Sequence, residues 1–407
     1  MADAIPESIE AGSEARAAFK TSDSEVVASV SRERLARARW ATRGQFLLLG
    51  FVVGTWGVHV PSIKAHYDLD ERLLAVALLA TSVGSLLTLV FAGRVVGQLG
   101  ARRASVFAGM AFTAALGASL LMPGYWTLLI AMLILGAGES VFDVAINAEG
   151  TTLEALSGRA VMSGFHGMFS FGAMAGAATA ALMLRAAFPD WMQLIGVGVF
   201  AGLCITLTSR GMLDAHPKSD AIEAHFAWPS GTLLVIGVLI CLGMLAEGVM
   251  YNWSVLYVKQ ELGTSQDRAA LAYIAFAGAT AATRFAGDAL RSRLSERTML
   301  LLGPAIAAMA MALVLFLARP WAAIAGFAAV GVGLATIVPI LYNAATRVSG
   351  VSRAAAIASV SSIGYVGFMI GPPIIGGIAH VTSLSMAMGT LIVASVILAI
   401  GSRRVPT

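Results

Sequence analysis

Long hydrophobic stretches alternate with short polar ones along the chain from Gln45 to Ile400. A helix needs about 20 apolar residues to cross the hydrocarbon of a bilayer. Because backbone polar groups inside hydrocarbon must be bonded within their own segment, such stretches are expected to be helices. The pattern therefore predicts an all-α membrane protein with twelve transmembrane helices, at 45–66, 72–93, 104–122, 126–149, 162–184, 192–209, 230–257, 269–287, 299–317, 322–345, 355–377 and 385–401.

The two halves of the sequence repeat each other. A shift of 195 positions places identical residues, mostly Trp and Gly, on one another: Trp126 on Trp321, Gly136 on Gly331, Gly138 on Gly333, Thr151 on Thr346, Gly172 on Gly367 and Gly176 on Gly371. Repeated units of six spans are typical of secondary transporters that bind their solute between the halves, near the middle of the membrane. We expect two pseudo-symmetric six-helix bundles, 45–209 and 230–401, joined by a linker over 210–229.

Composition and charge predict the class and the orientation of the protein. The chain is 58% hydrophobic and 12% charged, whereas a soluble domain has about a quarter charged residues. Lys and Arg gather in residues 1–44 and in the loops on the same side of the predicted membrane. The positive-inside rule then places both termini in the cytoplasm of a plasma (inner) membrane protein. The pI near 9.3 follows from this bias, so nucleic acid is not an expected partner.

The segments outside the bundles carry few functional signals. Residues 1–44 are expected to be a disordered cytoplasmic tail, with a short basic surface helix over 31–40 as the alternative. Residues 402–407 form the cytoplasmic C-terminus. Cys204 and Cys241 lie inside predicted spans without metal-ligand spacing, so no metal, cofactor or disulfide is expected. The expected partners are a small-molecule solute, protons and the lipid bilayer, with the monomer as the functional unit.

The loop after the second predicted span reads GRVVGQLGARR. It resembles the cytoplasmic latch of the major facilitator superfamily, which reads roughly G-x-L-x-D-R-x-G-R-R. The acidic position of the latch is Gly97 here, whereas the second half keeps Asp288 after Arg284. The resemblance implies that the gating charge lies at Arg284 and Asp288, with Arg94 and Arg102 as further gating residues. Ordinary residues at a helix end are the alternative.

A closer resemblance lies in the fourth predicted span, which contains GAGESVFDVAIN. Fucose–proton symporters and their relatives carry G-A-G, four residues, and then an acid followed by x-A-x-N in this helix. Asp143 falls on the protonatable carboxylate of that branch and Asn147 on its Asn. The seventh span is similar through Glu247, Trp253 and Tyr257, an E-x5-W-x3-Y pattern. The first span departs from sugar-carrying relatives, because no acid follows its Trp-Gly pair.

Ionisable side chains inside the membrane are candidates for the coupling chemistry. An unpaired charge in hydrocarbon is costly, so such groups are functional by default. Glu139 and Asp143 are four residues apart and share one helix face with Asn147. Two acids this close in a low dielectric favour holding a proton, as a proton carrier requires. We expect Asp143, Glu139 and His166 to carry the proton; acids locked by Arg or Ser to fix helix packing are the alternative.

The expected solute-binding residues are Asn147, Glu247, Trp253, Tyr257, His59 and Asn343. Glu247 lies in the half opposite Asp143, so the two are placed to bracket a solute. The rings of Trp253 and Tyr257 can stack on a flat ligand, or can belong to an ordinary interface belt. His59 can relay a proton, or can lie at a wet helix end.

These features favour a transporter over other classes. The leading hypothesis is a secondary active transporter that moves a small, sugar-like polar solute by proton symport and alternating access. The alternatives are proton-driven efflux of a metabolite or drug and, more remotely, a membrane sensor with a transporter scaffold. An enzyme is not expected, because the sequence contains no nucleophile with its base, no metal-ligand cluster and no nucleotide-binding loop.

Overall fold

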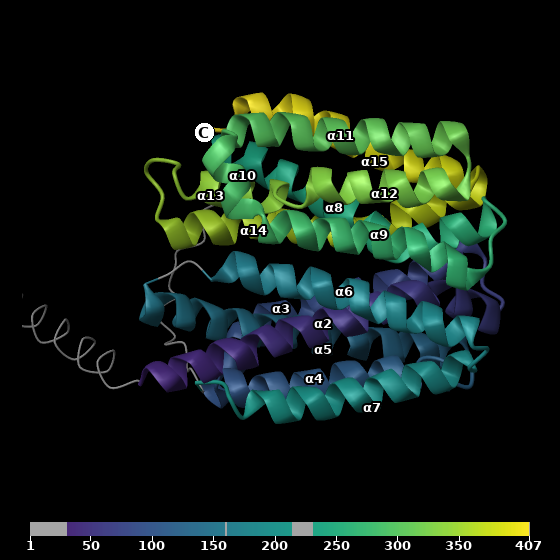
Figure 1. Cartoon of the computed structure of the whole chain (residues 1–407), viewed down its shortest axis with the longest axis horizontal. Helices are drawn as coiled ribbons and strands as arrows, with labels where there is room; N and C mark the ends of the chain where they lie inside the picture. The colour runs from purple at the N-terminus through teal and green to yellow at the C-terminus, as the bar shows by residue number, and fades with distance from the viewer. Residues whose placement is uncertain (1–30, 159–160, 214–230, 407) are drawn as a thin grey trace, which may run out of the picture.

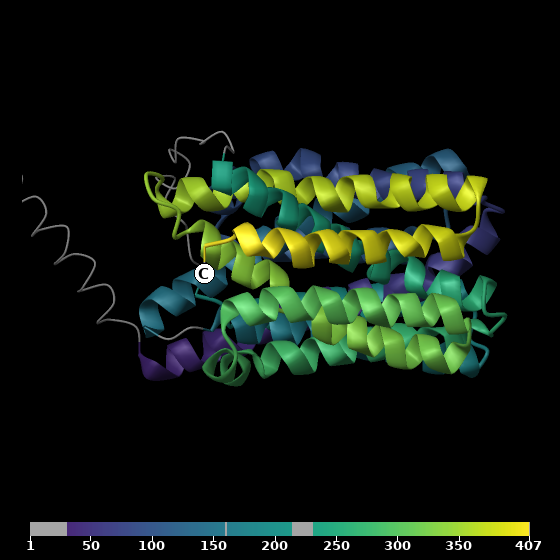
Figure 2. The same ribbon diagram turned by 90° about the horizontal axis from the view of Figure 1, so that it is seen from above.

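A computed structural model of the chain describes residues 31–158, 161–213 and 231–406. The described part consists of helices joined by short loops, and the long helices run along one axis in both views (Figures 1 and 2). Their bounds are α2 (Arg32–His66), α3 (Glu71–Leu99), α4 (Ala101–Ala118), α5 (Tyr125–Ser157), α6 (Met162–Arg185), α7 (Asp190–Ser209), α8 (Gly231–Gln260), α9 (Gln266–Phe285), α10 (Gly287–Arg293), α11 (Glu296–Leu317), α12 (Pro320–Leu334), α13 (Ile337–Ala345), α14 (Arg353–Val381), α15 (Leu384–Gly401) and η2 (Ser402–Arg404).

The helices account for the twelve predicted membrane spans. Ten segments of the described chain are long and apolar enough to cross a bilayer, and the consecutive helices α12 and α13 form one of them. The other two spans are α4 and α9, which are less apolar but are packed among neighbouring helices, α4 against α5 and α7, and α9 against α6 and α12. Burial among other helices explains why these two need less apolar surface than helices that face lipid. The predicted all-α membrane fold is confirmed.

The first helix begins earlier than the hydrophobic pattern indicates. The Ser31 side chain caps α2 by accepting a hydrogen bond from the Arg34 backbone nitrogen at 3.2 Å. The Arg34 guanidinium also donates to the backbone oxygen of Met212, just after α7, at 2.7 Å. Residues 32–44, assigned from the sequence to the tail, are therefore the first turns of α2. A helix over 31–40 was the alternative expected from the sequence, and the structure makes it continuous with the first span.

The helices form two bundles, α2–α7 and α8–α15, which occupy the lower and upper halves of Figure 1. A Cβ added at Gly136 on α5 would overlap the Thr81 carbonyl of α3. A Cβ added at Gly331 on α12 would lie 2.5 Å from the Phe276 carbonyl oxygen of α9. Thr81 and Phe276 are related by the same 195-residue shift as the two glycines. Each half thus brings the same two backbones together at the same position, which accounts for the repeated glycines.

The small residues of α6 and α14 have the same explanation. A Cβ at Gly172 or Gly176 would overlap a backbone carbonyl of α2, and one at Gly367 would overlap a carbonyl of α8. Gly371 differs, because no atom lies within 4 Å of a Cβ placed there. Small residues allow such close helix contacts in membranes. The bundles then meet along the pairs α3 with α14, α6 with α9, and α2 with α8.

Candidate functional site

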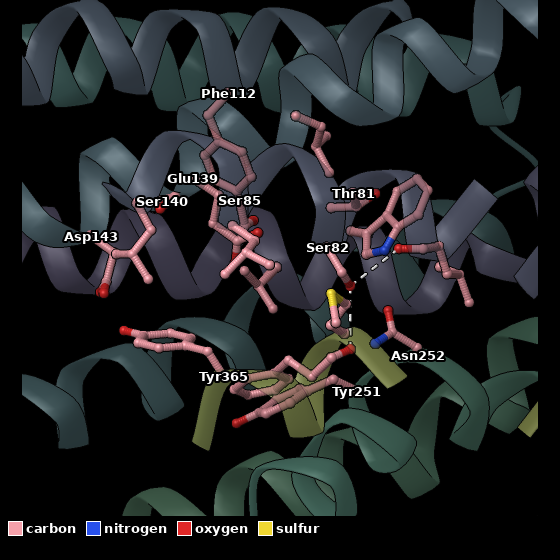
Figure 3. A pocket seen from close by; sticks show the side chains of 18 of the residues that line it. Thr81, Ser82, Ser85, Phe112, Glu139, Ser140, Asp143, Tyr251, Asn252 and Tyr365 are labelled. Carbon is pink, nitrogen blue, oxygen red and sulfur yellow. Dashed lines mark hydrogen bonds between the residues drawn. The ribbon is translucent and has the colours of Figure 1, made fainter. Parts of the chain in front are cut away.

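A cavity of about 280 Å³ lies between the two bundles. It is called the inner cavity below. Helices α2 to α6 line it on one side, and α8 and α14 on the other; Figure 3 shows the acidic side chains of α5 opposite Tyr251 and Tyr365. Its polar and aromatic lining residues are Trp56, Thr81, Ser82, Ser85, Phe112, Glu139, Ser140, Asp143, Phe169, Glu247, Tyr251, Asn252, Tyr365 and Phe368.

A larger hollow of about 1610 Å³ continues from the inner cavity toward the end of the molecule that carries the start of α2 and the C-terminus. This end is called the terminal end, the opposite one the far end, and the hollow the vestibule. Gly97, Arg291 and Thr346 line the vestibule near the ends of their helices. The residues that line both spaces are Asp143, Phe169, Glu247, Tyr365 and Phe368. The inner cavity is thus reached from the terminal end.

The predicted acid pair of α5 faces these two spaces differently. Glu139 lines only the inner cavity, Asn147 lines only the vestibule, and Asp143 lines both. The Asn147 amide donates to the Asp143 carboxylate and to its backbone oxygen, both at 2.9 Å. In the described part of the chain the Glu139 carboxylate has no hydrogen-bond or ion-pair partner. Asp143 is therefore fixed at the boundary, whereas Glu139 is available to a ligand.

Glu247 forms an ion pair across the vestibule wall. Its carboxylate lies 3.2 Å from the Arg284 guanidinium, and both side chains are largely buried. Arg284 also donates to the Ser170 hydroxyl of α6 at 2.8 Å and to the Ala335 backbone oxygen at 3.3 Å. The Ala335 carbonyl is available because Pro339, four residues later, has no N–H to donate to it. Arg284 thus joins α8, α9 and α12 of one bundle to α6 of the other.

The far end is closed by hydrogen bonds between the bundles. The Gln266 amide of α9 donates to the Val58 backbone oxygen at 2.8 Å and to the Ser62 hydroxyl at 2.7 Å, both on α2. The Gln266 side-chain oxygen accepts from the Lys259 ammonium at 2.8 Å. These two bonds therefore join a side chain of the second bundle to the backbone and to a side chain of the first. They hold the two bundles together at the far end.

His59 belongs to this closure and lies outside both cavities. Its ring is buried, with Nδ1 at 3.1 Å from the Ser62 hydroxyl and Nε2 at 3.1 Å from the Gln193 side-chain oxygen. Since the Gln193 oxygen can only accept, the His59 Nε2 donates, and a neutral ring then accepts from Ser62 at Nδ1. Ser62 in turn accepts from Gln266. His59 was predicted to contact the solute, but its ring lines neither the inner cavity nor the vestibule.

Trp253 and Tyr257 lie in the packed core of the second bundle. Each side chain is 1% exposed, and the Tyr257 ring packs against Phe327 with centroids 6.3 Å apart. Neither residue lines the inner cavity or the vestibule. Tyr251 lines the inner cavity instead, because it follows Glu247 by four residues and shares its helix face. The spacing of four residues from Glu247 could have predicted from the sequence that Tyr251 lines the cavity.

The remaining predicted coupling and binding residues line the vestibule. His166 contacts the Phe46 ring edge-on, with centroids 5.3 Å apart. Asn343 lines the vestibule near the terminal end, and its amide donates to the Glu296 carboxylate at 3.2 Å. Both residues therefore lie on the route between the terminal end and Asp143.

The predicted gating residues other than Arg284 lie at the terminal end. Arg94 is exposed and lines the vestibule. Arg102 is half-buried in the first turn of α4. Asp288 belongs to the short helix α10, and its side chain lies outside the described part of the structure.

Comparison with known proteins identifies the family of this fold. The family model of the Major Facilitator Superfamily matches residues 234–406. An uncharacterized MFS-type transporter of Yersinia pestis is 32% identical over 367 residues, which cover 90% of this chain and 95% of that protein. The chain belongs to the major facilitator superfamily. Membrane protein MosC of Rhizobium meliloti is similar to this transporter as well, at 30% identity over 368 residues and 88% of each chain.

Solved structures of superfamily members share the fold of this transporter. The fucose:proton symporter of E. coli superposes with a TM-score of 0.64 at 15% identity, covering 91% of this chain and 98% of the symporter. A D-xylose-proton symporter superposes with a TM-score of 0.70 at 14% identity, covering 89% and 96%. A bacterial homolog of the human lysosomal transporter Spinster, inward-facing and unoccupied, gives 0.66 at 15% identity, covering 92% and 98%. At these identities the similarity shows the fold.

In this member of the superfamily, the vestibule reaches the terminal end, whereas hydrogen bonds join the two bundles at the far end. The boundary residues Asp143 and Glu247 come from opposite bundles, so a solute between them would contact both halves.

Proposed function

We propose that this transporter couples the movement of a small polar solute to protons, by symport through the inner cavity. The observation that carries the proposal is Glu139, whose carboxylate faces the inner cavity without a partner in the described residues, one helical turn from Asp143. An acid at such depth is costly unless it takes up a proton or meets a cation. Proton uptake in the empty cavity therefore follows from the arrangement of the two acids.

Asp143 is the proposed proton carrier. It lines both the inner cavity and the vestibule, so a proton can reach it from water at the terminal end. His166 lines the vestibule along that route, and Asn147 orients the Asp143 carboxylate. Protonation of Asp143 then changes the charge at the place where the two bundles meet, which is where rocking motion must be controlled.

The proposed solute site is formed by side chains of both halves. Glu139 and Ser140 lie on α5, whereas Glu247, Tyr251 and Asn252 lie on α8. Hydroxyl groups and aromatic rings together suit a polyol-like molecule, which offers polar edges and apolar faces. The symport of fucose and of D-xylose by structural neighbours supports a sugar-sized solute. The cavity volume of about 280 Å³ is below the range of about 300–1,000 Å³ for drug-sized ligands.

The orientation follows from charge. Lys and Arg residues of the described chain gather at the terminal end, so we place that end in the cytoplasm and the protein in the inner membrane. Vestibule and cavity then open inward. One chain supplies both bundles and the whole cavity, which supports a functional monomer.

The test uses purified protein in proteoliposomes. A thermal-shift screen of monosaccharides, polyols, amino sugars and organic acids identifies a bound solute, and uptake of that solute is then driven by a pH gradient. Asp143→Asn mimics the protonated acid, so solute counterflow should persist while accumulation driven by the pH gradient is lost. Glu261→Gln, which changes an exposed acid at the far end, is the matched control.

Undiminished pH-driven accumulation by folded Asp143→Asn protein would show that the proton travels elsewhere, with Glu139 or His166 next in line. Solute-driven alkalinisation of the medium indicates symport. Acidification of the medium during uptake would indicate exchange against protons, as in the efflux alternative.

A further inference from the structure

The inner cavity has an unbalanced negative charge. Glu139, Asp143 and Glu247 line it, and no Lys, Arg or His of the described chain does so. Arg284 neutralises Glu247 from the vestibule side. Two carboxylates of α5 therefore face one small space without a positively charged partner. One proton can compensate only one of them, so the second needs either a proton of its own or another cation.

Two buried hydroxyl groups next to this space also lack partners. The Tyr251 side chain is 8% exposed and lines the inner cavity, yet its hydroxyl makes no hydrogen bond within the described residues. The Thr81 hydroxyl, on the opposite wall in α3, has no partner there either. Buried polar groups are nearly always hydrogen-bonded. The Tyr251 and Thr81 hydroxyl oxygens are thus enclosed in the wall of the cavity, whereas the Glu139 carboxylate is the unpaired group that faces the space.

These groups discriminate between classes of solute. A neutral sugar supplies no positive charge, so Glu139 would need a second proton in the cavity beside the one on Asp143. An ammonium group supplies both a positive charge and three hydrogen-bond donors. The aromatic lining adds to the preference, because the faces of rings such as Trp56 and Phe169 attract cations.

We propose that the solute of this transporter carries a protonated amine that binds the Glu139 carboxylate, with its hydroxyl groups toward the polar lining at Ser140 and Asn252. The substrate class is then small amino alcohols and amino sugars. This inference rests on the proposed function, since it assigns the solute of the same cavity. With a proton on Asp143 and the ammonium on Glu139, the loaded cavity is electrically neutral. That neutrality is what crossing the membrane interior requires.

The experiment compares matched pairs in which an amine replaces a hydroxyl: glucosamine and glucose, serinol and glycerol, N-methylglucamine and sorbitol. Affinities are measured by isothermal titration calorimetry on the purified, detergent-solubilised full chain at pH 7. The amine member of at least one pair should bind about tenfold more tightly, the gain expected when a neutral hydrogen bond becomes a charged one. Glu139→Gln should remove this preference, whereas Glu139→Asp and the exposed control Glu261→Gln should retain it.

The proposal is overturned if no amine binds more tightly than its neutral counterpart, or if the preference survives in folded Glu139→Gln protein. These outcomes differ from a failure of proton coupling. A neutral solute that accumulates with protons would leave the proposed function standing and remove the amine. An amine that binds at Glu139 but moves no protons would remove the symport and leave the amine standing.

Discussion

One side chain supplies hydrogen bonds between the bundles at the far end, and its contribution to the closure is open to a direct test. Gln266 donates hydrogen bonds from α9 to the Val58 oxygen and the Ser62 hydroxyl of α2, at 2.8 and 2.7 Å. Gln266→Ala removes these two bonds and changes no residue of the inner cavity. We expect the variant to populate the state open at the far end, because that state does not need these bonds.

The size of the shift follows from the two lost bonds. A hydrogen bond within a protein contributes a net stabilisation of about 0.5–1.5 kcal/mol. Two bonds therefore favour the closed state by about 1–3 kcal/mol, which corresponds to a change of about 5–150-fold in the equilibrium between the two states. The Lys259 ammonium loses its acceptor in both states, so it contributes little to the difference.

Distances between spin labels measure this equilibrium. Leu121 and Arg319 are exposed at the far end, one in each bundle, and lie away from the Gln266 network. Labels on cysteines at these two positions, in a background with Cys204 and Cys241 changed to serine, report the separation of the bundles by electron–electron double resonance. In Gln266→Ala a population with a longer distance should appear or grow.

Thr264→Ala is the matched control. The Thr264 hydroxyl donates to the Val258 backbone oxygen of its own bundle, 3.0 Å away, so its loss removes no bond between the bundles. It should leave the distance distribution unchanged. If Gln266→Ala gives the same distribution as the unsubstituted protein, then these bonds do not hold the far end closed and the reasoning fails.

Two further predictions concern stability, both read from thermal unfolding in detergent. Gly54→Val should destabilise the protein by about 3 kcal/mol or more, because its side chain would overlap the Ala173 carbonyl where α2 meets α6; Gly93→Ala, with no atom within 4 Å of the new Cβ, is the tolerated control. Arg284→Gln should cost about 3–5 kcal/mol because it leaves the largely buried Glu247 carboxylate without its partner. Adding Glu247→Gln should recover much of that loss, and a double variant no more stable than Arg284→Gln would contradict the pairing.

The fold could be predicted because its signals are local and repeated. The length of each hydrophobic stretch predicts a span. A glycine is needed wherever two helix backbones touch, and it occurs at equivalent positions in both halves, as at Gly136 and Gly331. For the polar first turns of α2 the sequence left two possibilities open, a disordered tail or a short surface helix over 31–40, since their hydropathy does not join them to the first span. Their helix is fixed by the Ser31 cap and by the bond of Arg34 to Met212, 178 positions away.

The candidate site could be predicted only as far as helical spacing reaches. Glu139 and Asp143 were placed on one face from their separation, and both line the inner cavity. Trp253 was chosen by its resemblance to a motif, although it lies six residues from Glu247 and therefore on another face of α8. Tyr251, four residues from Glu247, lines the cavity. A motif records which residues occur, whereas the helical period decides which of them reach the ligand.

Contacts between distant segments had no signal in the sequence. Arg284 bonds to the Ala335 oxygen because Pro339 leaves that carbonyl free, and the arginine reaches it only when α9 and α12 are packed together. No local pattern in the sequence connects Pro339 with Arg284. The Gln266 bonds to α2 likewise join residues more than 200 positions apart.

The helix α9 bonds to the first bundle near both of its ends. Gln266 is the first residue of α9 and binds α2 at the far end, while Arg284 lies in the last turn of α9 and binds Ser170 of α6 in the vestibule wall. The two lie about 27 Å apart along the helix at 1.5 Å per residue. Opening the far end must break the Gln266 bonds, whereas the Arg284 bond can persist as the point about which α9 tilts. Because Arg284 also pairs with Glu247 at the edge of the solute cavity, a change of charge there acts directly on that point.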